Sequence, residues 1–397
     1  MAHLSEALSN PQVPNAPRGG AQVVVIGAGL TGLVVARSLQ QRGYGVRVLE
    51  KSLGTGGRLN TRRVKEGRAD RGVRYLDGGL PLTAELIPPL RGRGIVKPWP
   101  GTGFQYCPSG VMPVEIQDRY CAPEGVSQVA KALAQGVEVS LNHRAIALVP
   151  PNPQASTPHW TIHCDHPRSE NPRQPLTYPP EDQIEASAVI MAIPAPQAEA
   201  LLATIPANRC PMVSTLLAAI APIRYDPCFS VTATYAAARD LDPPALRNWQ
   251  GIELPDDMTL AWIAREDRKC PDKIQPIVGF QSSAAFAERW VDAQDLYAIG
   301  RQLLARAEQL LNLPFRHPQS FQVHRWRYAQ VVNPLTEPYL QDSLTDLWVG
   351  GDWCGGNNVE AALASGVAIA QDFDAAHQNS GINPNLGSLV AAPAAIA

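Results

Sequence analysis

Three closely spaced glycines and a later glutamate are the residues whose types and spacing most clearly predict chemistry. Gly27, Gly29 and Gly32 follow an apolar run directly, and Glu50 ends the next apolar run. Glycines at this spacing allow a tight turn, let the backbone approach a pyrophosphate and let a helix pack closely on a strand. The phosphates then lie at a helix N-terminus, where free N–H groups favour negative charge. The pattern predicts a dinucleotide site formed by Gly27, Ala28, Gly29, Leu30, Thr31, Gly32, Glu50 and Lys51.

The segments around the motif supply the elements that must position it. Residues 22–26 are an apolar, β-branched run, residues 30–39 carry apolar side chains at helical spacing, and residues 46–49 form a second apolar run. This order predicts a strand–turn–helix–strand unit with a parallel sheet. A carboxylate at the end of the second strand accepts hydrogen bonds from ribose hydroxyls, which favours an unphosphorylated ribose, as in NAD or FAD.

A second glycine group follows Glu50. The string GTGGRLNTRR at 54–63 places Gly57 and Arg58 in another flexible loop beside the cofactor, with further arginines behind them. An arginine in such a loop can bridge a pyrophosphate or support the cofactor ring, and the alternative is a solvated surface arginine. The pair of loops favours a larger cofactor that lies extended.

Composition excludes several classes of protein. Among 397 residues, 34 basic and 36 acidic side chains give a net charge of −2 without a basic stripe, so we expect no nucleic-acid partner. The seven cysteines show no metal-ligand or CxxC spacing, which is typical of reduced cytoplasmic thiols. We expect no membrane span, no signal peptide, a cytoplasmic location, and disordered tails at 1–20 and 378–397.

The rest of the chain divides into two kinds of segment. Helical spacing at 126–133 leads into a strand from 136, an apolar strand covers 188–193, and the proline-rich stretch 150–180 predicts a β-meander with a long loop. Alternating runs at 229–235, 261–264, 277–281 and 321–327, with a helix at 296–311, predict an antiparallel domain. We expect two discontinuous domains. The first comprises residues 21–76, 120–220 and 329–377, and the second, a substrate domain, comprises residues 77–119 and 221–328.

With these motifs in place, the sequence resembles the FAD-dependent amine oxidase superfamily. The resemblance rests on the motif at 27–32, the acid at 50, GGR at 56–58, VEV at 137–139, VIMAIPAPQ at 189–197, and VGGDW followed by the helix 359–370. It implies an α/β fold: a Rossmann-like FAD-binding domain of the glutathione reductase and p-hydroxybenzoate hydroxylase type, with an inserted α+β substrate domain on an antiparallel sheet.

The resemblance also implies further cofactor contacts. The backbone of Val139 would contact the adenine, and Gly351 and Asp352 would face the ribityl chain or pyrophosphate. The helix N-terminus at Val359 and Glu360 would point at the pyrimidine edge of the flavin, where it stabilises negative charge. In covalent members of the superfamily the linking cysteine lies in a different segment from Cys354, so we expect non-covalent FAD.

Within the superfamily the sequence is most similar to the renalase-like NAD(P)/FAD-dependent oxidoreductases. The likeness rests on GRADRGVRYLD at 67–77, the segment 120–139 and HRWRYAQ at 324–330. Arg74 stands where that family usually has glutamine and puts a positive charge near the substrate. The resemblance implies hydride transfer to FAD from a small donor, either a dihydronicotinamide such as NAD(P)H or an amine, and electron transfer to molecular oxygen, which gives hydrogen peroxide.

No catalytic acid or base is strictly required for that chemistry, because the flavin carries the redox step. The candidates for the substrate face of the flavin are His324, Trp326, Tyr328 and Arg74, although aromatic side chains in an alternating strand are equally typical of core. His143, His159, His163 and His166 show no metal-ligand spacing, so no metal site is expected.

Two alternative functions remain open at this point. One is a flavin amine oxidase or a desaturase that acts on a hydrophobic substrate. The other belongs to a different class, a non-catalytic flavin-binding redox sensor or assembly factor. The lack of a nucleophile elbow, a Walker motif or a paired-carboxylate signature argues against hydrolases and kinases.

Overall fold

A computed structural model of the chain describes residues 22–378, apart from residues 66, 116–117, 157, 168–181, 238 and 271–274. The expected tails, at 1–20 and 378–397, lie outside the described residues, except that Gln378 is the last residue of a helix. The same holds for the proline-rich segment from residue 168 to its end at 180.

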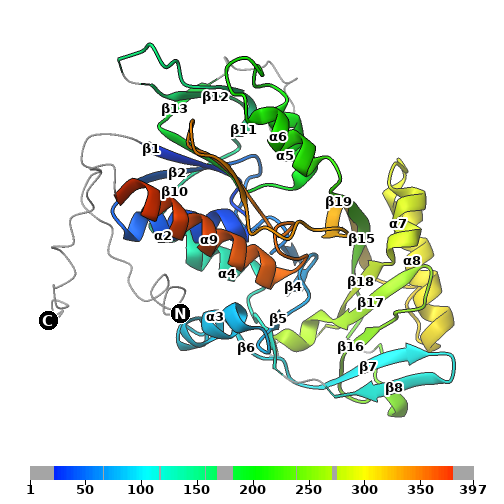
Figure 1. Cartoon of the computed structure of the whole chain (residues 1–397). Coiled ribbons are helices and arrows are strands. Elements are labelled where there is room, and N and C mark those ends of the chain that lie inside the picture. The colour runs from blue at the N-terminus through cyan, green and yellow to red at the C-terminus, as the bar shows by residue number, and fades with distance from the viewer. Residues whose placement is uncertain are drawn as a thin grey trace, which may run out of the picture.

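The first half of the fold is built on a six-stranded sheet (Figure 1). Its strands are β1 (Gln22–Ile26), β2 (Gly45–Glu50), β10 (Glu138–Leu141), β14 (Ala188–Met191), β20 (Leu340–Asp342) and β21 (Leu347–Val349). The order is β10-β2-β1-β14-β21-β20, and every pair is parallel except β20 with β21. The predicted strand–turn–helix–strand unit therefore lies at the centre of this sheet, with its strands within one residue of the expected bounds.

Alternate residues of β1 enter two different cores, because side chains of a strand point to opposite faces. Val23 and Val25 pack on one face, and Val24 and Ile26 on the other. The first face is covered by α2 (Leu30–Gln41), α3 (Pro81–Gly92), α4 (Ser127–Ala134) and α9 (Val359–Gln378). The second is covered by the antiparallel strands β11 (Arg144–Val149), β12 (Trp160–Asp165) and β13 (Asp182–Ala186), with α5 (Ala195–Leu202) and α6 (Val213–Ile220).

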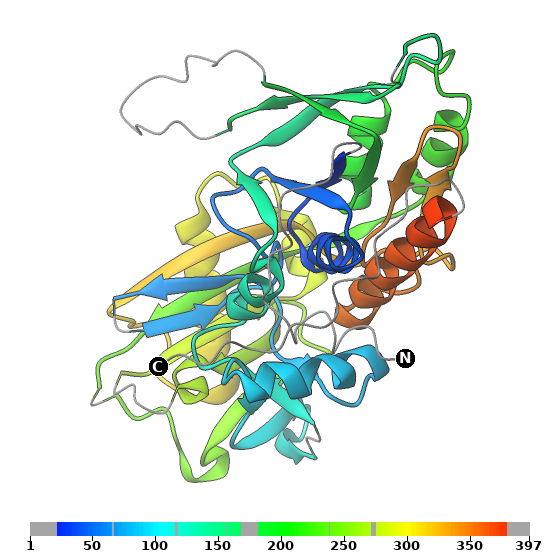
Figure 2. The ribbon, with the colours of Figure 1, turned by 90° about the vertical axis from the view of Figure 1, so that its left-hand side faces the viewer.

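Helices α2 and α9 lie side by side in both views (Figures 1 and 2), although most of the chain separates them. Gly366 permits the close approach, because a Cβ there would lie 2.9 Å from the carbonyl oxygen of Thr31. The hydroxyl of Thr31 donates a hydrogen bond of 2.9 Å to the carbonyl of Ala362. The first helix of the glycine motif is thereby attached to the C-terminal helix.

The second half of the fold is a seven-stranded sheet in the order β19-β15-β18-β17-β16-β7-β8. All pairs are antiparallel except β7 with β16. The strands are β7 (Thr102–Cys107), β8 (Gly110–Val114), β15 (Tyr225–Thr234), β16 (Trp249–Glu253), β17 (Leu260–Arg265), β18 (Ile277–Ser282) and β19 (Ser320–Val331). Phe229, Val231 and Phe280 point to one face, where they pack with α7 (Ala284–Trp290) and α8 (Leu296–Leu311). The opposite face, toward the first sheet, is less apolar. A short 3-10 turn, η1 (Pro244–Leu246), precedes β16.

Short elements join the two sheets. They are β3 (Thr61–Val64), β4 (Gly67–Asp70), β5 (Leu76–Asp77), β6 (Lys97–Pro98), β9 (Arg119–Cys121) and the 3-10 turn η2 (Glu266–Lys269). Helix α3, which falls in the segment 77–119 expected in the substrate domain, packs in the first core instead, because Leu86, Ile87 and Leu90 turn toward it. In the described part of the chain, no helix is both long and apolar enough to cross a membrane.

Gly32 is the glycine on which the packing of α2 depends most directly. A Cβ at this position would lie 2.0 Å from the carbonyl oxygen of Gly27. We expect Gly32→Ala to destabilise the protein by at least about 1–3 kcal/mol, as overpacking does. The exposed Gly92, at the end of α3, has no atom within 4 Å of such a Cβ, so Gly92→Ala serves as the control and should not lower the melting temperature. Equal melting temperatures for the two variants would contradict this account.

Candidate functional site

The glycine turn has the geometry that its sequence predicts. Gly27 has a φ of +105°, which favours glycine, and its N–H donates to the carbonyl of Leu49 at 2.8 Å. Gly29 is the N-cap of α2, and a Cβ placed on it would meet no atom within 4 Å. Leu30, at the start of the helix, is buried. Open space thus lies beside the first free N–H groups of α2, where a pyrophosphate would be held.

The carboxylate of Glu50 is fixed by this turn. Its Oε2 accepts from the N–H of Ala28 at 2.9 Å, and its Oε1 accepts from the N–H of Ser52 at 2.8 Å. The residue is buried, yet each oxygen keeps a further lone pair for a ribose hydroxyl. Lys51, the next predicted contact, is exposed. Val139 lies in β10 and pairs with Val48 of β2, the strand that ends at Glu50.

The second glycine loop packs directly against the first. The N–H of Gly56 donates to the carbonyl of Ala28 at 2.7 Å, and a Cβ on Gly57 would lie 3.5 Å from the Cα of Gly29. A Cβ on Gly54 would meet no atom within 4 Å. The two loops together therefore form a cradle lined by backbone and open on one side, which fits an extended dinucleotide.

Arg58 and Asp352, predicted separately as cofactor contacts, form a bidentate ion pair. The guanidinium donates to the two carboxylate oxygens at 2.6 and 2.5 Å, and it also donates to the carbonyl of Ala329 at 3.1 Å. Burial lowers the pKa of Arg58 and the Asp352 carboxylate raises it by more, so the net shift is upward. Arg58 is thus a fixed positive charge next to the cradle, not a solvated surface arginine.

Helix α9 begins at Val359, as predicted, and the side chain of Glu360 binds another helix. Asn358 caps the helix, and its Oδ1 accepts from the N–H of Ala361 at 2.9 Å. The Glu360 carboxylate turns to α3, where it accepts from the N–H groups of Leu82 and Thr83 and from the Thr83 hydroxyl. Val359 and Glu360 therefore offer the cofactor only backbone. Gly351, before the helix, is held by a bond of 3.1 Å from its N–H to Ser365.

The aromatic candidates on β19 lie on the face of the antiparallel sheet that looks toward the first sheet. The indole N–H of Trp326 donates to the carbonyl of Arg71 at 2.9 Å, and His324 contacts the Trp326 ring edge-on at 4.3 Å. Tyr328 makes an edge-on contact with Tyr225 at 5.6 Å. All three side chains are partly accessible, so none belongs to the buried core behind the sheet.

Arg74 lies on the same face, over the middle strands. Its Nε donates to the amide oxygen of Gln281 at 2.7 Å, and its guanidinium stacks over Trp262 at 5.0 Å. Burial and, to a lesser extent, the nearby Arg119 lower its pKa. Among the described residues, no carboxylate lies within ion-pair distance of Arg74, whereas Arg119 is paired with Glu253 at 2.6 Å.

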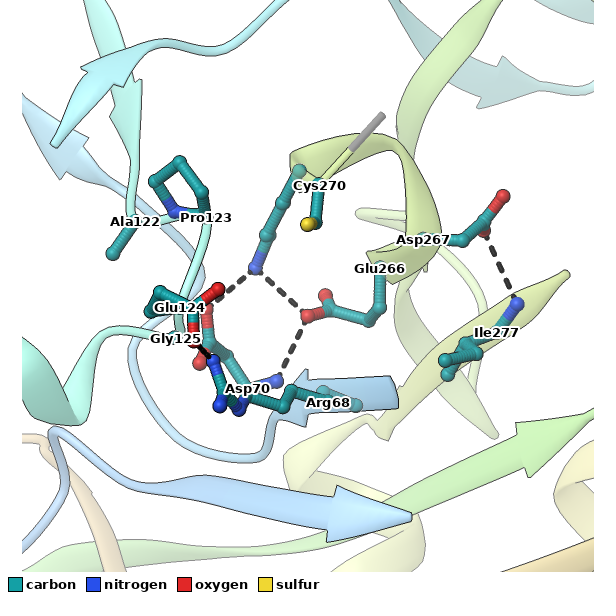
Figure 3. A pocket seen from close by; sticks show the side chains of 12 residues that line it. Arg68, Asp70, Ala122, Pro123, Glu124, Gly125, Glu266, Asp267, Cys270 and Ile277 are labelled. Carbon is teal, nitrogen blue, oxygen red and sulfur yellow. Dashed lines mark hydrogen bonds and ion pairs between the residues drawn. The ribbon is translucent and has the colours of Figure 1, made fainter. Parts of the chain in front are cut away.

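A buried charge cluster between the two sheets was not predicted. The ammonium of Lys269 lies 2.9 Å from a carboxylate oxygen of both Asp70 and Glu266, and Figure 3 shows the two acids converging across a pocket. Burial and Asp70 raise the pKa of Glu266 and Lys269 lowers it by less, which leaves it at about 7. The pocket holds about 10 Å³, room for one water and not for a substrate. Asp70 is distant in sequence from Glu266 and Lys269, and the three residues match no motif, so the fold reveals the cluster.

The structure also brings together His143, His166 and Asp182 beside the small antiparallel sheet. His159 and His163 are not part of this group. No metal site was expected here from the sequence.

Comparisons with known proteins agree with this geometry. A family model described as an NAD(P)-binding Rossmann-like domain matches residues 25–84, and one described as flavin containing amine oxidoreductase matches residues 98–373. Among curated proteins, the flavin-dependent L-tryptophan oxidase RebO of Lentzea aerocolonigenes is 48% identical over 50 residues, which is 13% of this chain and 11% of that protein. A Drosophila melanogaster protein, described as a possible lysine-specific histone demethylase 1, is 47% identical over 64 residues, 16% of this chain and 7% of that protein. The matches thus span only a small part of these relatives.

Solved structures match over nearly the whole chain. A putative protoporphyrinogen oxidase from Exiguobacterium sp. 255-15 aligns with a TM-score of 0.65 and 11% identity, over 90% of this chain and 99% of its own. Cyclohexylamine oxidase from Brevibacterium oxydans IH-35A aligns with a TM-score of 0.63 and 12% identity, over 90% and 100%. At this identity the likeness shows the fold, which is the α/β fold expected from the sequence.

The contribution of the ion pair of Arg58 with Asp352 can be tested by comparison with an exposed ion pair. We expect Asp352→Asn to destabilise the protein by roughly 1.5–3 kcal/mol and to weaken FAD retention, because it leaves a largely buried guanidinium without its counter-charge. Arg327→Ala, which removes an exposed pair with Asp292 of 2.9 Å, should change stability by less than about 1 kcal/mol. Urea unfolding and FAD absorbance after dialysis measure both effects. Full FAD retention by Asp352→Asn would contradict the assigned role.

The lowered pKa of His324 predicts how the stability of the protein depends on pH. Burial, with the nearby Arg71 and Arg62, lowers its pKa from 6.5 to about 4. Because the folded state resists a proton that the unfolded state accepts, wild-type stability falls as pH drops from 6.5 to about 4. His324→Gln should lose less stability over this window, as measured by the melting temperature. His317→Gln, at an exposed histidine, should keep the wild-type slope; the idea fails if His324→Gln keeps it as well.

Proposed function

The chain belongs to the family of flavin-containing amine oxidoreductases, and on this basis we propose that it oxidises a small anionic donor at bound FAD. The proposed donor is a dihydronicotinamide such as NAD(P)H, and the proposed electron acceptor is molecular oxygen. The family match makes the protein a flavin-dependent oxidoreductase with FAD as its cofactor.

The observation that carries the proposed donor class is the unbalanced charge of Arg74. A guanidinium that is largely removed from water and lacks a carboxylate partner is costly, unless a ligand supplies the negative charge. The hydrogen bond to Gln281 uses the Nε–H of Arg74. The other N–H groups of this guanidinium can therefore donate to the two oxygens of a phosphate or carboxylate. Trp262 offers an aromatic surface beside it. An anionic donor with a planar ring fits these features, and a protonated amine would be repelled.

The chain's own residues have separate tasks in this scheme. Bound FAD supplies hydride acceptance from the donor and electron transfer to oxygen. The glycine loops hold the pyrophosphate, Glu50 accepts from the ribose hydroxyls, and Arg58 supplies positive charge at the cradle. Burial keeps His324 neutral at pH 7, so it adds no charge to the face on which the donor lies.

An α-amino acid is a second candidate donor. Its carboxylate suits Arg74, and the related protein RebO is named as a flavin-dependent L-tryptophan oxidase. The two donors differ in where their anionic group lies relative to the carbon that loses the hydride. We place the reaction in the cytoplasm, supported by the thiols of all seven cysteines, which are free in the structure.

Anaerobic mixing with a donor panel tests the proposal. We expect NADH or NADPH, in a normal or isomeric form, to bleach the flavin absorbance, with oxygen restoring it and yielding hydrogen peroxide. Faster bleaching by amino acids would favour the second candidate. Bleaching only by uncharged amines, or by none of the panel, would overturn an anionic donor.

The role of Arg74 has a closely matched control. Arg62 donates from Nε to the amide oxygen of Gln322 at 2.7 Å, as Arg74 does to Gln281, but on an exposed part of the surface. We expect Arg74→Gln to raise KM for the anionic donor by about 10–100-fold, the loss of a charged hydrogen bond, and Arg62→Gln to change it less than about threefold. Steady-state kinetics measure both. Equal effects of the two variants would remove Arg74 from the donor site.

A further inference from the structure

We propose that His143, His166 and Asp182 bind a divalent transition-metal ion of the zinc type, at a site separate from the cofactor. The site lies where the small sheet of β11, β12 and β13 meets the end of β2 (Figure 1). It belongs to neither the dinucleotide cradle nor the substrate face.

The strand register explains why three residues with no common sequence spacing converge. Arg144 pairs with Asp165, and Cys164 pairs with Asp182. His143 immediately precedes the first pair, and His166 immediately follows it, so the two histidines face each other across the end of the sheet. Asp182 begins the neighbouring strand at the same end. Spacing along the chain hides this arrangement, because it depends on antiparallel pairing.

Hydrogen bonds fix which imidazole nitrogen of each histidine can bind a metal. The Nδ1 of His143 lies 2.8 Å from the carbonyl of Leu141, and the Nδ1 of His166 lies 2.9 Å from the carbonyl of Asn142. A carbonyl only accepts, so both Nδ1 atoms carry the proton. The Nε2 lone pair of each neutral ring is then free. Metal-binding histidines are typically held in this way, by a carbonyl at the other nitrogen.

The two Nε2 atoms point at the same carboxylate oxygen. The Nε2 of His166 lies 3.0 Å and that of His143 lies 3.6 Å from Oδ2 of Asp182, and the three ligand atoms lie within 4.8 Å of one another. Ligands about 2.0–2.1 Å from a tetrahedral zinc ion are about 3.3 Å apart, so the ligand atoms must approach one another by up to about 1.5 Å, which side-chain rotation can supply. Two nitrogens and one oxygen suit zinc, with water at the open position.

With both rings neutral and protonated on Nδ1, the two Nε2 lone pairs face the same carboxylate oxygen of Asp182. A cation among the three atoms removes both repulsions, whereas without a metal a proton on each Nε2 is needed instead. The side chains are also accessible enough for a metal to enter, with 21% of each imidazole and 51% of the Asp182 side chain exposed.

The site borders the cofactor segment without taking part in it. The N–H of His143 donates to the carbonyl of Glu50 at 2.9 Å, and that of Asn142 donates to the carbonyl of Ser52 at 3.0 Å. A bound ion would therefore connect β11, β12 and β13 to one another and hold the turn behind Glu50. We assign it a structural role.

Zinc titration of the full-length protein, stripped with a chelator and loaded with FAD, tests the proposal. We expect one Zn²⁺ per chain by calorimetry, a rise in melting temperature on zinc addition, and an intense visible spectrum with Co²⁺, the mark of tetrahedral coordination. His143→Ala, His166→Ala and Asp182→Asn should each weaken zinc binding at least about tenfold, as metal sites generally do when a supporting or ligating group is lost.

His159→Ala is the matched control. His159 lies beside the same small sheet and also contacts a carboxylate, with its Nε2 3.2 Å from Glu185, but it belongs to no group of three metal-ligating side chains among the described residues. We expect this variant to bind zinc as the wild type does. The FAD spectrum reports whether each variant is folded, so a misfolded histidine variant leaves the isosteric Asp182→Asn as the deciding one. No zinc binding by the wild type, or zinc binding unaffected by Asp182→Asn, would overturn the proposal.

Discussion

The cofactor end of the molecule depends on the ion pair between Arg58 and Asp352, which joins residues 294 positions apart. Arg58 comes from the second glycine loop, Asp352 from the glycine-rich turn after β21, and the carbonyl of Ala329 that Arg58 also contacts comes from β19. One guanidinium thus holds together the first sheet, the C-terminal turn and the antiparallel sheet. Because Asp352 is buried and the two bonds are charge-assisted, the geometry of this junction is strongly specified.

Around this pair, the packing of the first sheet brings two helix N-termini to the same region. Alternation along β1 fills cores on both faces, so a shift of this strand by one residue would exchange the two sets of side chains between the two cores and disrupt the packing of both. Close contact of α2 with α9 at Gly366 then places the starts of both helices beside the cradle. In the proposed function, free N–H groups from these two distant segments face one cofactor, which carries a pyrophosphate at one place and an electron-rich ring at another.

The charges between the two sheets differ in whether the protein balances them. Lys269 is enclosed by Asp70 and Glu266, and the pocket there is too small for a ligand, so this cluster holds the two sheets together. Arg119 is paired with Glu253 in the same way. Arg74 contacts the neutral Gln281 and the face of Trp262, and no carboxylate in the described part of the chain lies within ion-pair distance of it. This contrast is the basis for proposing that Arg74 binds the substrate while Lys269 and Arg119 are structural.

The features that depend on short-range interactions along the chain could be predicted from the sequence. The glycine turn, Glu50 and the strands around them follow from steric and periodic constraints that act within some thirty residues, and they appear where predicted. Only the tertiary structure revealed three other features: the ion pair of Arg58 with Asp352, the hydrogen bonds from α3 to Glu360, and the packing of α3 in the first core. The same is true of Lys269 with its acids, and of His143, His166 and Asp182. Apart from Glu266 and Lys269, which share one 3-10 turn, these partners are distant in sequence and meet only through tertiary packing, so spacing along the chain does not indicate that they are neighbours.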